Sequence, residues 1–146
     1  MKFEDIKKVG VLGGGIMGGG IAQTYAVAGY QVAVCDINDD AITATKHAVF
    51  DGKWGIKRGV ERGKIPFDDA VAAMGRVSFG TDHGVLAACD YIIEAIPEKL
   101  ELKQQVLAAL DKVVKPEAIF ASNTAGFVSE EVARDVSEAR KKLFIG

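Results

Sequence analysis

The feature that most constrains the fold is a glycine-rich segment near the amino terminus, VGVLGGGIMGGGIA, which spans residues 9–22. A short apolar run precedes three consecutive glycines, and small and apolar residues follow them. This pattern predicts a buried strand that turns sharply into a helix, because glycine adopts backbone conformations that other residues avoid. The segment therefore places a strand–turn–helix unit at the start of the chain.

Three of these glycines, Gly13, Gly15 and Gly18, have the spacing G-x-G-x-x-G. Between a strand and a helix, this spacing is typical of a dinucleotide-binding site. The first glycine permits the tight turn, the second lets the backbone approach a pyrophosphate, and the third lets helix and strand pack closely. The unpaired N–H groups at the helix start would face the anion, so we expect Ile16 and Met17 beside the cofactor as well. The alternative for the same residues is a flexible linker.

Residues 9–35 carry no charged side chain, and a stretch of this length could cross a bilayer. Eight glycines and the polar residues Gln23, Thr24 and Gln31 interrupt it, however. A buried strand–turn–helix–strand unit explains the missing charges better, since central parallel strands are covered on both faces. We therefore expect no membrane association.

Strand-like and helix-like stretches alternate along the whole chain, which predicts a parallel sheet. With right-handed crossovers and a glycine turn after the first strand, the strand order 3-2-1-4-5-6 of a doubly wound Rossmann domain is expected over residues 1–146. The expected strands are 8–12, 31–36, 77–79, 91–96, 118–121 and 143–145, and the expected helices are 15–28, 67–74, 84–88, one capped by Asn38, one from Pro97 to Pro116, and one capped by Ser129 that ends near Asp135.

Residues 51–63 form an insertion between the second and third strands that is long for a simple crossover. Four glycines interrupt it, so a broken helix or a helix and turn projecting from the core is expected. Trp54 and the basic residues Lys53, Lys57 and Arg58 lie within it. Both a solvated basic face and a ligand site remain open for these residues.

Asp36 closes the second expected strand, 18 residues after the last glycine of the motif. An acid at this position accepts hydrogen bonds from the ribose hydroxyls of a dinucleotide and repels a 2′-phosphate. Ile37 and Asn38 follow, and neither is the arginine that would attract that phosphate. The sequence therefore favours NAD over NADP, the alternative being that Asp36 caps a helix.

In an open parallel sheet, ligands bind at the carboxyl ends of the strands. The fourth and fifth strands bring two further loops to that edge, and their polar side chains are suited to a ribose or a carboxamide, although Ser and Asn also stabilise ordinary turns. The additional cofactor-binding candidates are Ala95, Ile96, Glu98, Lys103 and Asn123, and Ser122 is a further candidate ligand-binding residue.

Oxidation of an alcohol usually needs a general base, most often histidine. The two histidines, His47 and His83, are expected in a helix and in a polar turn, so we assign no catalytic residue. Cys35 and Cys89 have no metal-ligand or redox spacing and are expected to be buried thiols in a reducing compartment. No metal site is predicted.

The formal net charge is −2 and no long basic run occurs, which argues against nucleic acid as a partner. The first residues lack the apolar core of a signal peptide, so a cytoplasmic protein is expected.

Three segments together resemble the NAD-binding domain of 3-hydroxyacyl-CoA dehydrogenases. They are residues 9–23, residues 93–98 with 100–103, and residues 121–124, and they occur in the family's order and spacing. The resemblance implies NAD-dependent oxidation of L-3-hydroxyacyl-CoA to 3-ketoacyl-CoA, in fatty-acid β-oxidation or butanoate metabolism. An acyl-CoA is then the substrate.

The resemblance also implies roles for individual residues. Positions matching Glu98 and Lys103 lie near the nicotinamide ribose in the family, and the one matching Asn123 lies beside the nicotinamide. The family's insertion after the second strand helps to hold CoA, which makes Lys53 and Lys57 candidates for substrate binding.

Two departures from the family pattern limit these expectations. Ala125 stands where the family usually has a serine close to the substrate oxygen. The family's catalytic histidine and its partner glutamate lie beyond the last residue, Gly146, as does the helical domain that usually mediates dimerisation. We therefore expect a catalytically incomplete part of a homodimeric enzyme. The alternatives are a non-catalytic dinucleotide-binding module and a dehydrogenase of a small free 3-hydroxy acid.

Overall fold

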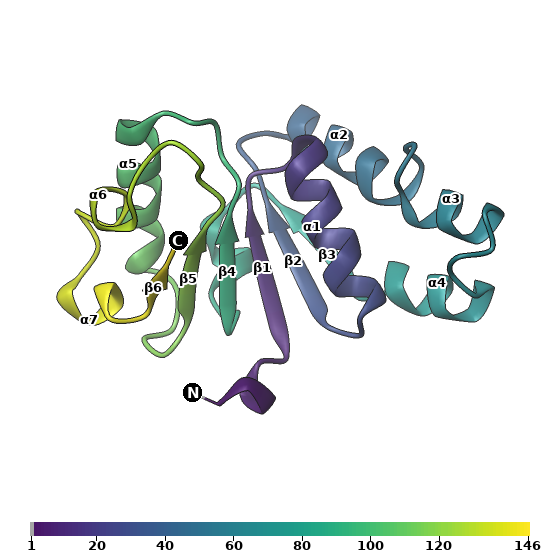
Figure 1. Ribbon diagram of the computed structural model, residues 1–146, viewed down its shortest axis with the longest axis horizontal. Helices are drawn as coiled ribbons and strands as arrows, with labels where there is room; N and C mark the ends of the chain where they lie inside the picture. Colours follow the sequence, from purple (N-terminus) through teal and green to yellow (C-terminus); the bar gives the residue numbers. More distant parts are fainter. Residues whose placement is uncertain (1) are drawn as a thin grey trace.

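A computed structural model describes residues 2–146. Its centre is a six-stranded parallel sheet with the order β3-β2-β1-β4-β5-β6, which confirms the predicted topology (Figure 1). The strands are β1 (Lys8–Leu12), β2 (Gln31–Cys35), β3 (Val77–Gly80), β4 (Tyr91–Glu94), β5 (Ile119–Ser122) and β6 (Phe144–Ile145).

Helices cover both faces of this sheet, as a doubly wound fold requires. Alternate residues of β2 show the two layers: Val32 and Val34 pack with α1 to α4, whereas Ala33 and Cys35 pack with α5 and α6. The helices are α1 (Gly15–Val27), α2 (Asp39–Phe50), α3 (Ile56–Glu61), α4 (Phe67–Met74), α5 (Leu100–Asp111), α6 (Ser129–Val132) and α7 (Glu138–Lys141), and the 3₁₀ turns are η1 (Phe3–Asp5) and η2 (His83–Leu86).

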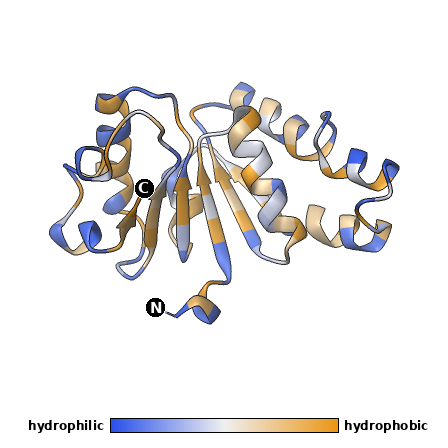
Figure 2. Ribbon diagram, viewed as in Figure 1, coloured by the Kyte–Doolittle hydropathy of each residue, from blue (hydrophilic) through white to orange (hydrophobic). Residues whose placement is uncertain are grey.

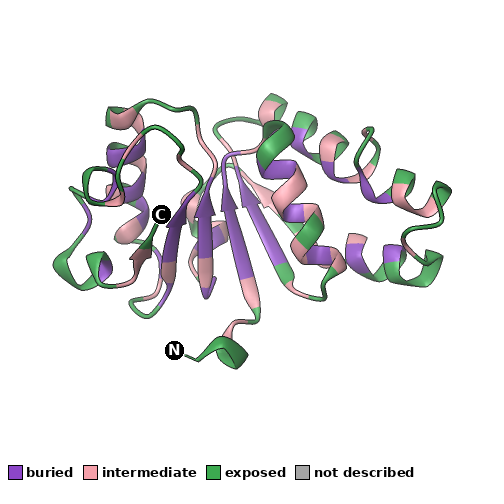
Figure 3. Cartoon of the chain, in the orientation of Figure 1, coloured by how far each residue is buried: buried purple, intermediate pink, exposed green. Residues whose placement is uncertain are grey.

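Burial on two faces accounts for the charge-free segment at residues 9–35. β1 and β2 are buried along almost their whole length, and hydrophobic residues line the central strands (Figures 2 and 3). Within the described residues, no helix has both the length and the apolar character needed to cross a membrane.

The insertion folds as a turn followed by the short helix α3, which agrees with the expected helix and turn. Together with α4 it extends away from the sheet at the end of the molecule opposite α6 and α7 (Figure 1). Ile56 anchors it, because this side chain is fully buried in the cluster that α1 and α2 share. The basic residues of the insertion remain exposed.

The predicted boundaries of two helices are wrong at both ends. Helix α5 begins at Leu100 rather than at Pro97, since the carboxylate of Glu98 is bound to the loop after β5 instead of joining a first turn. It also ends at Asp111, well before Pro116. Helix α6 is one turn long and Ser129 lies inside it, with Val128 as the capping residue. Helix α7 has no counterpart among the predicted elements.

Candidate functional site

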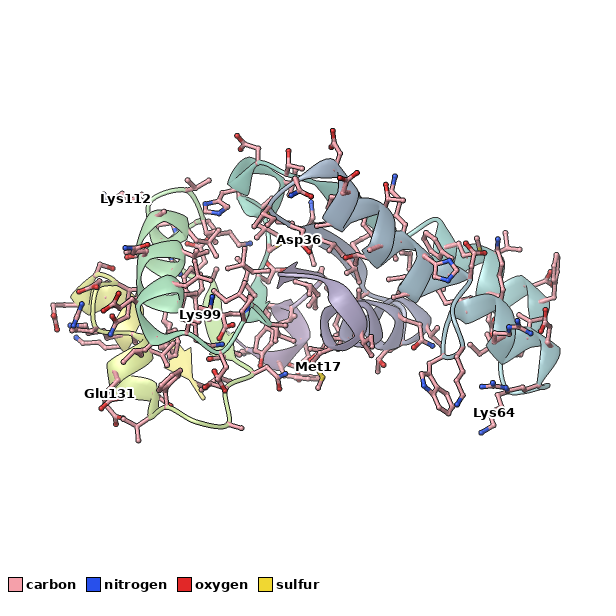
Figure 4. All side chains as sticks on the ribbon, turned by 90° about the horizontal axis from the view of Figure 1, so that it is seen from above. Met17, Asp36, Lys64, Lys99, Lys112 and Glu131 are labelled. Atoms are coloured by element: carbon pink, nitrogen blue, oxygen red, sulfur yellow. The ribbon has the colours of Figure 1, made fainter. Side chains whose placement is uncertain are left out.

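A cleft of about 640 Å³ lies at the carboxyl ends of the parallel strands. Figure 4 looks onto this edge and labels Met17 on α1 and Asp36 after β2, both of which line the cleft. Sixteen residues from five segments form its wall, which are Leu12–Met17, Cys35–Ile37, Thr81 with His83, Ala95–Pro97, and Leu102 with Val106. The cleft therefore joins the glycine turn, the predicted ribose-binding acid and the loop after β4.

The glycine turn has the tight geometry expected of it. Gly13 and Gly15 have φ angles of +92° and +69°, which side chains disfavour. A Cβ on Gly13 would lie 2.9 Å from the carbonyl oxygen of Ala95, and one on Gly18 only 2.2 Å from that of Gly13. No atom lies within 4 Å of a Cβ built on Gly15, so this side of the turn is open. That opening is the approach a pyrophosphate needs.

The first turn of α1 offers free hydrogen-bond donors to the cleft. The amide of Gly15 donates to the hydroxyl of Thr45 (3.3 Å) and that of Gly18 to the carbonyl of Gly14 (3.2 Å). The backbone N–H groups of Ile16 and Met17 have no hydrogen-bond acceptor within residues 2–146, and both residues line the cleft. Two unpaired amides at a helix start, near the positive end of its dipole, fit an anion.

Asp36 projects into the cleft from the carboxyl end of β2. One carboxylate oxygen, Oδ1, accepts the amide hydrogen of Ile37 (2.8 Å), which fixes the side chain and leaves Oδ2 available. A Cβ on Gly14 would lie 2.5 Å from that Oδ2 and 1.8 Å from Oγ1 of Thr45. Gly14 is therefore a required glycine that the sequence reasoning missed, because its two neighbours are distant in the sequence.

Glu98 lies at the other side of the glycine turn, on the loop between β4 and α5. Its carboxylate accepts hydrogen bonds from the Thr124 hydroxyl (2.7 Å) and the amides of Ala125 (2.9 Å) and Gly126 (3.3 Å). The Thr124 and Ala125 bonds, together with Lys103, lower the pKa of Glu98 to about 2. Glu98 thus carries a negative charge and holds the loop that follows Asn123.

Beneath this loop lies a buried ion pair. The ammonium of Lys103 donates to both carboxylate oxygens of Glu94 (2.9 and 2.8 Å) and to the carbonyl of Ile96 (3.2 Å), and it lies 3.2 Å from Glu98. The Ser122 hydroxyl also donates to Glu94. The structure places Lys103 and Ser122 inside the protein, beneath the cleft wall, so their predicted contacts with cofactor and substrate stay predictions.

Three other predicted residues lie at the same edge of the sheet. Ala95 and Ile96 line the cleft, and the amide of Ala95 is fixed by the carbonyl of Leu12 (2.8 Å). Asn123 is exposed, and its amide donates to the carbonyl of Glu94 (2.9 Å), which anchors the backbone and leaves the side chain free to meet a ligand. The expected grouping of these loops is present.

His83 lies in a turn, as expected, but its half-buried side chain also lines the cleft, which the sequence reasoning did not predict. It follows β3 within η2, whose cap is Asp82. Applying the strand-end rule to β3 as well as to β2, β4 and β5 would have found His83 and Thr81. Since β3 and β5 are separated by three strands, His83 lies far from Asn123. His47 is exposed in α2, as expected.

Lys53 and Lys57 do not line the cleft. The Lys57 ammonium pairs with Asp51 (2.6 Å), and the Lys53 ammonium lies 5.0 Å from the centre of the Trp54 ring. A separate hollow of about 300 Å³, between α1 and the insertion, is lined by Trp54 and other residues of both elements. The two lysines lie on the insertion and line neither the cleft nor this second hollow.

Burial explains the behaviour of the two thiols. Both cysteines are free and buried, as expected, and burial raises the pKa of each thiol to about 11. In residues 2–146, no group of three or more His, Cys, Asp or Glu side chains is arranged to hold a metal ion.

Comparison with known proteins identifies relatives of this domain. The family model described as the NAD binding domain of 3-hydroxyacyl-CoA dehydrogenase matches residues 8–146. A probable 3-hydroxybutyryl-CoA dehydrogenase of Deinococcus radiodurans is 36% identical over 139 residues, which are 95% of this chain and 48% of the relative. The mitochondrial hydroxyacyl-coenzyme A dehydrogenase of Rattus norvegicus is 33% identical over 144 residues, 97% of this chain and 45% of the relative.

A solved structure shows the same arrangement. The crystal structure of 3-hydroxybutyryl-CoA dehydrogenase from Escherichia coli matches with a TM-score of 0.86 and 31% identity, covering 94% of this chain and 28% of that one. The chain spans about half the length of the two curated relatives, so the similarity concerns their NAD-binding part.

Proposed function

Because the chain belongs to the family of 3-hydroxyacyl-CoA dehydrogenase NAD-binding domains, we propose that it forms the cofactor half of an enzyme that oxidises L-3-hydroxyacyl-CoA to 3-ketoacyl-CoA. The observation that carries this proposal is the single cleft that joins the open glycine turn, Asp36 and the loop after β4. NAD is the cofactor of this domain and supplies the hydride acceptor when it is bound.

The residues of the cleft suit the parts of NAD in order along the sheet. Asp36 would accept hydrogen bonds from the adenosine ribose, and the free amides of Ile16 and Met17 would bind the pyrophosphate. The remaining half of the cofactor then extends over β4 and β5, toward Glu98 and Asn123. There Asn123 would hydrogen-bond the carboxamide, and the negative Glu98 would face the ribose.

Lys103 has a different proposed role from the direct contact expected from the sequence. Its ammonium is enclosed by Glu94, Ile96 and Glu98, so it would act by holding Glu98 rather than by touching the cofactor. Ser122 is bound to Glu94 in the same way, and its substrate contact would require that hydrogen bond to open. We retain Lys53 and Lys57 as candidates for the CoA end of the substrate, since both are exposed on the insertion.

The proposed chain length of the substrate and the proposed metabolic role rest on the names of the relatives. Two of them are named 3-hydroxybutyryl-CoA dehydrogenases, which supports a short-chain acyl-CoA substrate and a place in butanoate metabolism. A cytoplasmic homodimer without nucleic acid or membrane partners remains part of the proposal. In residues 2–146, neither histidine lies at the β5 side of the cleft, so we expect these residues alone to bind NADH without turning it over.

The experiment measures NADH in two steps. Titration of this chain with NADH tests cofactor binding, and the full-length gene product that contains it is then assayed for NADH oxidation with acetoacetyl-CoA or with free acetoacetate. We expect binding by the chain and oxidation that depends on acetoacetyl-CoA. Oxidation with acetoacetate alone would indicate a free hydroxy acid as substrate, and binding without any oxidation would indicate a non-catalytic module.

A further inference from the structure

Glu94 is a carboxylate with no contact with solvent, located at the carboxyl end of β4. An ionised group in this position must be paired and hydrogen-bonded, because its desolvation is costly. Four hydrogen bonds meet that requirement: Oε1 accepts from Ser122 and Lys103, and Oε2 accepts from Lys103 and from the amide of Ile96 (2.8 Å). Its position among these donors is therefore strongly determined.

These four bonds come from three separate segments that surround one side of the cleft. The Ile96 amide belongs to the loop after β4, Lys103 to the first turns of α5, and Ser122 to the end of β5. In Figure 1, β4, β5 and α5 lie side by side at this edge. The carbonyl of Glu94 also accepts the amide of Asn123 (2.9 Å). One residue thus fixes both loops of the β4–β5 side.

The link continues from Lys103 to Glu98, which lies 3.2 Å from its ammonium, and from Glu98 to the residues that follow Asn123. The amides of α1 and Asp36 lie on the β1–β2 side, outside this chain of contacts. The glycine turn packs against Ala95 and Ile96, but the amide of Ala95 is held by Leu12 and not by Glu94. Removing the Glu94 carboxylate should therefore loosen one half of the cleft and leave the other half unchanged.

We propose that Glu94 is a positioning residue for the nicotinamide half of the cofactor, acting through Lys103 and Glu98 and through Ser122 and Asn123. This inference rests on the proposed NAD-binding function. The two halves of the cleft then contribute to cofactor affinity independently. The β1–β2 side binds the adenosine diphosphate part without help from Glu94, whereas binding of the nicotinamide half on the β4–β5 side depends on this buried carboxylate.

The same strand offers a matched control at its opposite end. Asp90 is also buried, accepts the amides of Lys7 and Lys8 (2.8 and 2.9 Å), and forms an ion pair with Lys115 after α5. The Asp90–Lys115 pair has the same chemistry as the Glu94–Lys103 pair, but it lies at the amino end of β4 and its lysine is partly exposed. A general loss of stability should follow from changing either acid.

The test compares the dissociation constants of NADH and of ADP-ribose, which lacks the nicotinamide, for the wild-type chain and three variants. Glu94→Gln and Glu94→Gln/Lys103→Met should weaken NADH binding by about tenfold, as expected for losing hydrogen bonds to a charged group. ADP-ribose affinity should stay within about twofold of wild type, since its contacts are unaffected. Asp90→Asn should leave the ratio of the two constants unchanged while lowering the melting temperature.

The double variant keeps the test valid if Glu94→Gln does not fold, because removing both partners leaves no unpaired buried charge. An equal loss of NADH and ADP-ribose affinity would show a merely structural role and overturn the inference, as would unchanged NADH affinity in a folded variant. If wild-type protein binds neither ligand, the proposed function itself fails. These outcomes are distinct from one another.

Discussion

The α-carbon of Gly18 faces the carbonyl oxygen of Gly13 so closely that an added Cβ would lie 2.2 Å from that oxygen. Gly18 has ordinary helical backbone angles, so the requirement for glycine is one of space. The contact brings the first turn of α1 directly against the end of β1. The position of the helix start, and with it of the unpaired amides of Ile16 and Met17, depends on this contact.

Gly18→Ala should lower both the free energy of unfolding and the affinity for NADH. The methyl group cannot be accommodated unless α1 moves away from the turn, and overpacking of this kind typically costs about 1–3 kcal/mol. Urea unfolding followed by circular dichroism measures the stability, and a fluorescence titration measures the binding of NADH.

Gly20→Ala is the matched control on the same helix. No atom lies within 4 Å of a Cβ at this position, and alanine is favoured over glycine in a helix by about 1 kcal/mol. The control should therefore be more stable than wild type with unchanged NADH affinity. If Gly18→Ala were stabilised to the same extent, the close contact would not exist in solution.

The topology could be predicted because every strand and most helices have a local signature. Residues 32–35 of β2 form an uninterrupted apolar run. Helix α2 begins at Asp39, directly after the predicted cap Asn38, whose side chain accepts the amide of Ala41. Helix α5 was misplaced because Pro97 followed by Glu98 has the composition of a first helical turn. The competing contact of Glu98 with Thr124 spans 26 residues and leaves no local trace.

The candidate site was predictable only at the level of which loops meet. The rule for strand ends brought Glu98, Lys103 and Asn123 to one edge, as the structure shows. It could not show that the Lys103 side chain turns inward to Glu94, since burial of a lysine depends on a partner located elsewhere in the fold. The glycine requirement at Gly14 likewise depends on Thr45, which is 31 residues away in the sequence.

The two cysteines should be unreactive in the folded protein. Burial raises the pKa of each thiol to about 11, so almost no thiolate, the reactive form, is present near neutral pH. We expect negligible reaction of the native protein with an aromatic disulfide reagent at pH 8. In urea, both thiols should react and release two equivalents of the reagent's thiolate per chain. Fast modification of one native thiol would show that its side chain is accessible in solution.

Glu98 should make stability depend on pH in the acid range. Its pKa in the folded protein is about 2 compared with an ordinary value of 4.5, so the ionised side chain stabilises the fold above pH 4.5. That contribution is lost as pH falls from 4.5 toward 2. The melting temperature of wild type should therefore fall more steeply over this interval than that of Glu98→Gln.

Comparing the two proteins removes the effect of the other carboxylates. Asp90 and Asp111 also have lowered pKa values and are present in both proteins. The difference between the two melting curves reports on Glu98 alone, and parallel curves from pH 5 to pH 2 would contradict its hydrogen-bonded state.

Asp36 should make the domain prefer NADH over NADPH. The Oδ2 oxygen remains available to ribose hydroxyls, whereas a 2′-phosphate placed there would meet a negative charge at short range. Such repulsion is about 1–4 kcal/mol at 4 Å near a protein surface. NADPH should therefore bind about ten- to a hundredfold more weakly than NADH when both are measured by calorimetry.

Asp36→Asn should reduce the preference for NADH over NADPH. The amide removes the repulsion of the 2′-phosphate of NADPH, and it also weakens the hydrogen bond to the ribose of NADH. Asp40→Asn is the matched control, since Asp40 is an exposed acid in the first turn of α2 and does not line the cleft. It removes the same charge and should leave the preference intact. An equal shift in both variants would mean that the general field of the acids around α2, and not the contact made by Asp36, selects the cofactor.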